Sequence, residues 1–208
     1  MYSRSAWWLS NNAVNPTCFA VSRRVRGTRR ATPRTRVTAN VRPQEDMEDK
    51  AYKLTRDVAG EPYDFLVTTL LERGQAFGLV WREQLRFAET AAAVRAELQP
   101  LQLRLRKVDR WPGTRLVGHR ASVLTYRCDP AARSVLTRPG SLFSWHAPSY
   151  PEDLWFVAEA NSLLLASVAH QRQAWVFSKP LARVLGQRIT LELEPREAGD
   201  AKYFELAV

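Results

Sequence analysis

The chain of 208 residues contains few of the residue types that cross-link a fold, ligate metals or cross membranes. Its only cysteines are Cys18 and Cys128, which excludes the disulfide framework of a small secreted domain. It has three histidines and no pair at zinc-ligand spacing, so we expect no metal site and no cofactor. No apolar run approaches the ~20 residues that span a bilayer, so we expect no membrane span. The remaining composition, 45% hydrophobic and 25% charged, is typical of a soluble globular protein.

The sequence motifs of several enzyme classes are also absent. The chain contains no G-x-x-x-x-G-K-[ST] phosphate loop, no G-x-G-x-x-G dinucleotide turn, no H-E-x-x-H zinc motif and no G-x-S-x-G nucleophile elbow. Cys128 stands alone after a predicted strand, where a small buried hydrophobe is a more common role than a nucleophile. These absences lead us to expect a protein without enzymatic activity.

Positive charge is concentrated at the start of the chain. The formal net charge is +10, and residues 1–44 hold nine arginines and no acidic residue. Residues 45–208 hold the other 22 basic and all 21 acidic side chains, so this part is nearly neutral. We therefore interpret residues 1–46 as a disordered Arg-rich leader and residues 47–208 as a single globular domain.

Three interpretations of the leader remain open. Its acid-free composition with arginine, serine and threonine is typical of an organellar transit peptide. Met47 begins a segment that reads like a natural protein start, so a mis-assigned start is the second interpretation. The third is a basic arm that binds nucleic acid. A transit peptide implies an organellar location, and otherwise we expect a bacterial cytoplasmic protein.

The spacing of apolar residues and the positions of glycine and proline indicate the helices and strands of the domain. Apolar residues at helical spacing predict a helix over 62–73, and Gly74 is placed to end it. Further helices are predicted over 89–98 and 180–185. Strands are predicted at 76–81, 101–106, 115–127, 142–145, 154–157, 162–168, 174–177, 189–194 and 203–208. The pattern predicts an α+β fold, with a mostly antiparallel twisted sheet of about 6–9 strands and two to four helices packed on one face or edge.

Residues 101–127 carry the strongest charge asymmetry of the domain, with seven basic residues and one acid. Leu103 and Leu105 alternate with polar residues, which predicts a half-buried strand, and Pro112-Gly113 predicts a turn into the next strand. If these two strands pair, their basic side chains crowd one face and require acids from the same chain or an anionic partner. The residues that we predict to bind such a partner are Arg104, Arg106, Arg110, Trp111, Arg115 and His119.

Five tryptophans lie at or beside the predicted strands and turns of the domain. We expect them to fill the core, with a hydrogen-bond partner for each indole N–H, although tryptophan and arginine also dominate binding surfaces. These residues are Trp81, Trp111, Trp145, Trp155 and Trp175.

A histidine beside a carboxylate is the one catalytic arrangement that the sequence offers. General acid–base catalysis needs a titrating group held near a partner in a pocket. The candidates are His146, His170, Glu152 and Asp153. We interpret the two acids first as solvated loop residues, and we retain a hydrolytic site as an alternative.

Residues 150–178 resemble a pattern found in small uncharacterised bacterial proteins. In that pattern, Pro-Glu-Asp-Leu precedes a strand and a hairpin, followed by Ser-x-x-His-Glu-x-x-Ala-Trp. The matching residues here are Pro151–Leu154, Ser167, His170, Ala174 and Trp175, and Gln171 stands in place of the glutamate. The resemblance implies a bacterial cytosolic α+β domain and implies no activity.

These observations favour a non-enzymatic, partner-binding domain, such as an immunity protein or an adaptor. It would dock an acidic patch of a protein partner onto the basic, tryptophan-flanked strands of segment 101–127. Two alternatives remain: a nucleic-acid-binding protein that uses the leader, and a small hydrolase with the histidine–carboxylate site.

Overall fold

The computed structural model describes residues 50–195 and Phe204. The strands in this part are β1 (Lys50–Leu54), β2 (Ala76–Arg82), β3 (Gln102–Val108), β4 (Arg110–Trp111), β5 (Thr114–Arg115), β6 (Ala121–Arg127), β7 (Glu152–Val157), β8 (Leu163–Val168), β9 (Gln173–Val176) and β10 (Leu191–Pro195). The helices are α1 (Glu61–Arg73), α2 (Glu89–Leu98), α3 (Arg133–Thr137) and α4 (Lys179–Leu185).

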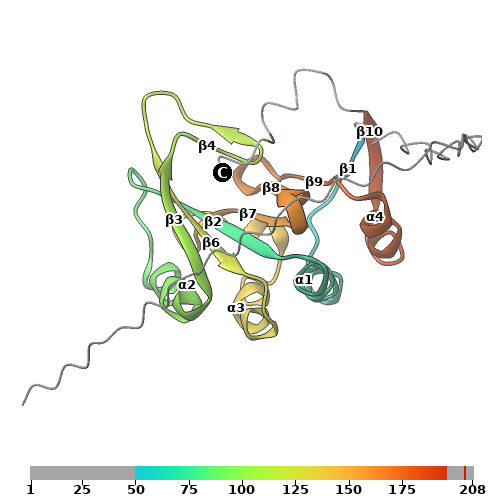
Figure 1. Cartoon of the computed structure of the whole chain (residues 1–208), viewed down its shortest axis with the longest axis horizontal. Coiled ribbons are helices and arrows are strands. Elements are labelled where there is room, and N and C mark those ends of the chain that lie inside the picture. Colours follow the sequence, from blue (N-terminus) through green and yellow to red (C-terminus); the bar gives the residue numbers. More distant parts are fainter. Residues whose placement is uncertain (1–49, 196–203, 205–208) are drawn as a thin grey trace, which may run out of the picture. The chain divides into compact units, whose positions relative to one another are not determined.

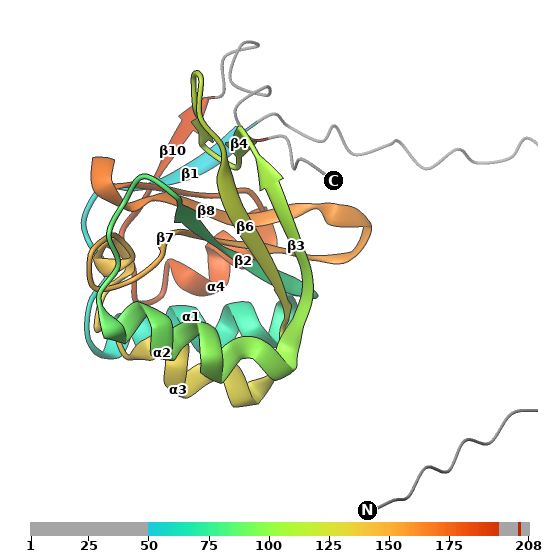
Figure 2. The same ribbon diagram turned by 90° about the vertical axis from the view of Figure 1, so that its left-hand side faces the viewer.

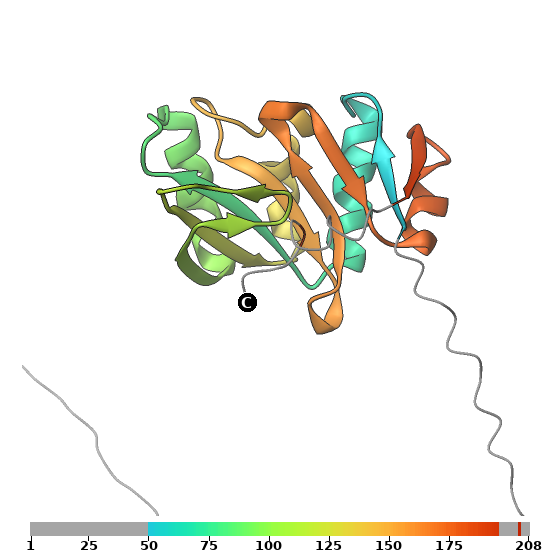
Figure 3. The same cartoon turned by 90° about the horizontal axis from the view of Figure 1, so that it is seen from above.

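Eight of these strands form one sheet in the order β10-β1-β9-β8-β7-β2-β6-β3. All neighbouring pairs are antiparallel, and β7, β8 and β9 form the predicted meander. Figure 3 shows the strands side by side, from the green end of the sheet to its red end. Strand β3 lies at one end, and β6 is its only neighbour among the described strands. The predicted α+β class, with a mostly antiparallel sheet, is confirmed.

The helices pack on one face of the sheet, as Figures 1 and 2 show for α1, α2 and α3. Helix α1 begins with Pro62 in its first turn, carries acids there, and buries one face. Helix α2 buries Ala91, Val94 and Leu98, which recur at helical spacing. These faces and the sheet residues beneath them form the main core.

Two hydrogen bonds lie at the centre of the main core. The Trp145 indole N–H donates to the Tyr63 hydroxyl over 2.6 Å, and that hydroxyl donates to the Leu136 carbonyl over 2.7 Å. All three residues are fully buried, so the network satisfies polar groups that water does not reach. It joins α1, α3 and the segment before β7.

The opposite face of the sheet carries a second, smaller core. The β4–β5 hairpin folds over part of this face and buries Trp111 there, beside Val80 and Trp155. Phe204 packs on the same face, where its ring contacts Trp175 at a centroid distance of 5.2 Å. Beside β3, the same face is hollowed by a pocket.

Two of the strand predictions are corrected. Residues Leu142–Ser144 form a 3-10 turn, because the Asp57 carboxylate accepts the Phe143 N–H and holds the segment against the core. The predicted strand over 115–127 is two strands, β5 and β6, separated by a loop in which Gly118 has a positive φ of 74°. Helix α3 and strand β1 were not predicted by the pattern.

Leu103 and Leu105 lie in a strand, as predicted, but they are 58% and 43% exposed rather than half-buried. The reason is the position of β3 at the end of the sheet, where no further described strand covers its outer edge.

The predictions for the leader over 1–46 and for the strand over 203–208 concern segments outside the described residues, apart from Phe204. The single-domain prediction for residues 47–208 likewise stays a prediction. Among the described residues, no helix combines the length and apolar character that a membrane crossing requires.

Candidate functional site: a basic groove beside strand β3

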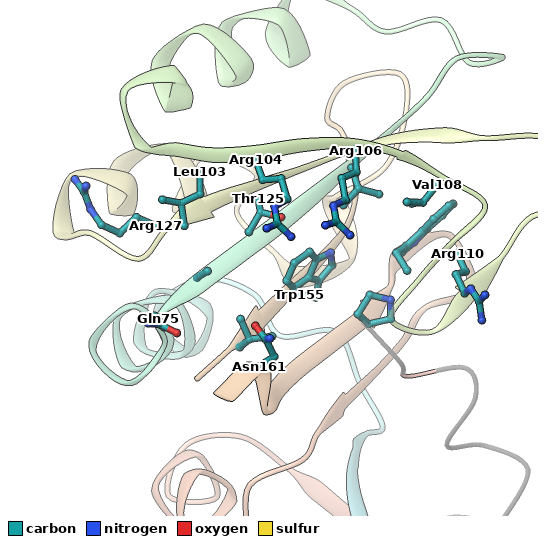
Figure 4. Close-up of a pocket in the computed structure, with 15 residues that line it drawn as sticks. Gln75, Leu103, Arg104, Arg106, Val108, Arg110, Thr125, Arg127, Trp155 and Asn161 are labelled. Atoms are coloured by element: carbon teal, nitrogen blue, oxygen red, sulfur yellow. The ribbon is translucent and has the colours of Figure 1, made fainter. Parts of the chain in front are cut away.

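A pocket of about 520 Å³ lies on the open face of the sheet, next to the edge strand β3. Side chains from β2, β3, β4, β6 and β7 line it, and Asn161 closes its lower side in Figure 4. Four of the lining residues are arginines, and no aspartate or glutamate is among those that the structure describes there. We call this pocket the basic groove. Its size is that of a site for one or two side chains or a small ligand.

Trp155 forms the floor of the basic groove (Figure 4). It is 5% exposed and pairs in register with Gly78 of β2. A Cβ atom on Gly78 would lie 2.0 Å from the indole Cζ2, so a glycine is required for the ring to lie against the strand. The indole Nε1 is buried and has no hydrogen-bond partner, which contradicts our expectation that every indole N–H is satisfied.

Arg104 and Arg106 form one wall of the basic groove. They are two residues apart on β3 and pair with Thr125 and Val123 of β6, so both lie on the open face. Figure 4 shows both guanidinium groups directed toward Trp155. Among the described residues Arg104 makes no ion pair.

The structure brings together four of the six residues predicted to bind a partner. Arg104, Arg106, Arg110 and Trp111 line the basic groove. Arg115 and His119 are exposed and lie outside its lining. The cause is the separate β4–β5 hairpin, in which Arg115 pairs with Arg110 and not with β3.

Asp153, predicted to be a solvated loop residue, is fully buried. Its carboxylate accepts hydrogen bonds from Trp111 Nε1 at 2.8 Å, Thr114 Oγ1 at 3.3 Å and the Ala169 N–H at 3.0 Å. Burial raises the pKa of Asp153 to about 6, although these hydrogen bonds favour the charged form. Asp153 therefore clamps the β4–β5 hairpin to the sheet, and the solvated interpretation is wrong.

Glu152 is also buried, where a solvated acid was predicted. Its carboxylate forms a two-pronged ion pair with the Arg82 guanidinium, and one of the contacts joins Oε1 to Nη2 at 2.6 Å. The ion pair compensates the negative charge of Glu152 inside the sheet, as a buried carboxylate usually requires.

The two candidate histidines do not complete a hydrolytic site with these acids. His170 Nδ1 lies 4.0 Å from Asp153 Oδ1, which is beyond hydrogen-bond length, and its side chain is 37% exposed. His146 is exposed, and its Nδ1 lies 2.8 Å from the carbonyl of Ala147. The Thr114 hydroxyl donates to Asp153, so it is engaged in the clamp.

The Cys128 thiol and the possible metal ligands are the other groups to consider. Burial raises the pKa of the Cys128 thiol to about 12, which keeps it protonated and unreactive near neutral pH. Among the residues described, no three histidine, cysteine, aspartate or glutamate side chains are grouped as a metal site requires.

The sequence pattern did not identify Trp155 as a groove residue, nor its support from Gly78. A glycine inside the apolar run of β2 was the available signal, since glycine within a strand often marks the close approach of another group. Comparison of the chain with protein-family models, curated proteins and solved structures finds no match.

Proposed function

We propose that this protein is a non-enzymatic binding domain that docks an acidic segment of a protein partner in the basic groove. The observation that carries the proposal is the Arg104 guanidinium, which makes no ion pair among the described residues and is directed toward Trp155, whose buried indole N–H has no hydrogen-bond partner. Both groups only donate hydrogen bonds. A carboxylate, which only accepts them when ionised, is the matching group.

The surroundings of the basic groove favour a carboxylate carried by a protein. Leu103 and Leu105, two of the most exposed large apolar side chains of the described residues, lie on the strand that bears the two arginines. Arginine and tryptophan are the residues most often found at the centre of protein interfaces. An acidic side chain therefore enters the groove while neighbouring apolar surface is covered by the partner.

Part of the positive charge near the groove is neutralised within the chain. Lys107 pairs with Glu83 at 2.5 Å, and Arg127 pairs with Asp129 at 3.3 Å. This is the internal neutralisation that the sequence left open as an alternative to a partner. It does not extend to Arg104, which supports binding at that point of the wall.

The two alternative functions have less support from the described residues. The nucleic-acid alternative depends on the leader, which lies outside them. The hydrolase alternative depends on His146 or His170 beside Glu152 or Asp153. Glu152 is paired with Arg82, and Asp153 is occupied in holding the hairpin.

The test uses the full-length protein and a displayed library of random peptides. We expect the enriched peptides to be rich in aspartate and glutamate, and their binding to weaken about tenfold between about 50 and 300 mM salt. Arg104→Glu should weaken binding at least about tenfold, because it reverses a charge in the wall. Arg133→Glu on α3 is the matched control, since it makes the same charge change on the helical side and should leave binding unchanged.

Two results would overturn the proposed function. One is enrichment of peptides without acidic residues, and the other is equal loss of binding in both arginine variants. Preference for a single-stranded DNA oligonucleotide over acidic peptides, insensitive to Arg104→Glu, would favour the nucleic-acid alternative instead.

A further inference from the structure

We infer that the acidic side chain bound in the basic groove is accompanied by an apolar side chain of the same partner, which packs on Leu103. This inference rests on the proposed function and specifies the sequence pattern of the segment that the groove binds. It comes from a β-bulge in β3 that places Leu103 and Arg104 on the same side of the strand.

The bulge is a shift in the pairing of β3 with β6. Gln102 pairs with Tyr126, and two residues later Arg104 pairs with Thr125, so two steps along β3 match one step along β6. In a regular strand, successive side chains point to opposite faces of the sheet. The extra residue interrupts this alternation, and the consecutive residues Leu103 and Arg104 both line the basic groove. Figure 4 shows both side chains on the groove side of β3.

A comparison with Leu105 shows what the bulge changes. Leu103 and Leu105 are two residues apart, a spacing that places side chains on one face of a regular strand. Leu105 pairs with the buried Leu124 of the main core, so it lies on the helical face. Leu103 lines the groove instead and is 58% exposed. The bulge therefore leaves an apolar side chain in contact with water at the groove.

Three groups of different chemistry thus lie in one groove. Among the described residues Arg104 makes no ion pair, and the buried indole N–H of Trp155 has no hydrogen-bond partner. Both of these groups match a carboxylate. Leu103 adds apolar surface, which is removed from water only when another apolar group covers it. The occupant that matches all three groups carries a carboxylate and an apolar side chain on one side.

The adjacency of Leu103 and Arg104 determines the spacing of these two side chains in the partner. Because the two residues are consecutive, the groups that contact them must project from the partner on the same side and close together. In an extended segment, the nearest side chains on one side are two residues apart, at about 7 Å along the chain. Side chains three residues apart project from opposite sides. We therefore expect an acidic residue with an apolar residue two positions away.

The experiment measures binding of two fluorescein-labelled peptides to the full-length protein by anisotropy. Ser-Leu-Ser-Glu-Ser-Leu-Ser has a leucine two positions from the glutamate in both directions, so its direction in the groove does not affect the test. Leu-Ser-Ser-Glu-Ser-Ser-Leu has the same composition, with each leucine three positions from the glutamate. We expect the first peptide to bind at least about fivefold more tightly, because only it presents leucine and carboxylate on one side.

Two leucine variants test whether Leu103 is the residue that contacts the apolar side chain. Leu103→Ser removes apolar surface from the groove and should reduce the difference between the peptides to less than about twofold. Leu105→Ser is the matched control, since it makes the same change on the same strand but on the helical face, and it should leave the difference unchanged. Far-ultraviolet circular dichroism checks that both variants fold. If one does not, the comparison of the two peptides on the unsubstituted protein still decides the question.

The outcomes separate this inference from the proposed function. Equal affinities of the two peptides, tighter binding of the second, or no binding of the first would each overturn the paired acidic and apolar pattern, as would an undiminished difference in Leu103→Ser. The proposed function would survive those results if displayed acidic peptides still bind in an Arg104-dependent way. If Arg104→Glu leaves the binding of every peptide unchanged, both proposals are wrong.

Discussion

Two fully buried tyrosines provide a matched test of how this core satisfies its polar groups. Tyr63 and Tyr126 both belong to the main core and are both inaccessible to solvent. The Tyr63 hydroxyl accepts from the Trp145 indole and donates to the Leu136 carbonyl. The Tyr126 hydroxyl has no hydrogen-bond partner. The same Tyr→Phe substitution therefore has opposite consequences at the two positions.

Tyr63→Phe leaves a buried indole N–H and a buried carbonyl without this partner. Each buried polar group that loses its hydrogen bond costs about 1–3 kcal/mol. We expect the free energy of unfolding to fall by about 2–4 kcal/mol, which lowers the melting temperature by roughly 5–12 °C for a chain of this size. Tyr126→Phe instead removes a polar atom that was buried without compensation. Its free energy of unfolding should stay unchanged or rise by about 1 kcal/mol.

The assay is urea denaturation of each variant, followed by far-ultraviolet circular dichroism so that changes near Trp145 do not distort the signal. The dependence of the free energy on urea should be the same in all three proteins, because the surface exposed on unfolding is unchanged. Equal destabilisation by both substitutions would refute the reasoning, as would a Tyr63→Phe variant as stable as the original.

Two further predictions concern the open face. Gly78→Ala should lower the free energy of unfolding by about 1–3 kcal/mol and weaken peptide binding in the basic groove, because its Cβ would lie 2.0 Å from Trp155. Urea denaturation and the peptide assay measure the two effects. An unchanged free energy of unfolding would contradict the close approach. Folding raises the pKa of Asp153 from 3.8 to about 6, so between about pH 4 and pH 6 the folded chain binds more protons than the unfolded chain. The free energy of unfolding should therefore fall as the pH rises through this range. Asp153→Asn should remove about 3 kcal/mol of this pH dependence in urea denaturation at pH 4 and pH 7, and an identical dependence in both proteins would show that the carboxyl does not titrate in this range.

Local pattern was sufficient to identify many of the elements. Helices α1 and α2 were predicted within one residue at either end, since their apolar spacing and their terminating residues are consecutive in sequence. The meander β7-β8-β9 was also predicted, because each strand is a short apolar run separated by a brief connection. Helix α3 was missed because its five residues contain too few turns for a periodic pattern.

Part of the candidate site could also be predicted. The arginines of segment 101–127 and the turn at Pro112-Gly113 marked a basic strand pair, and four of those arginines line the basic groove. The turn, however, closes the separate β4–β5 hairpin, and this removed Arg115 from the groove. A pattern of residues predicts that a turn forms but not which strands it joins to the sheet.

The sequence by itself determined the α+β class, the segregation of charge and the alternation along β3, because each of these depends on residues that are neighbours in the chain. Only the tertiary structure decided that β3 lies at one end of the described strands, that Trp155 lies over Gly78 beneath two arginines, and that Glu152 and Asp153 are buried. The physical reason is that exposure depends on which strands and hairpins pack beside a residue. Those contacts join segments that are dozens of residues apart, such as Trp111 with Asp153, and no local periodicity encodes them.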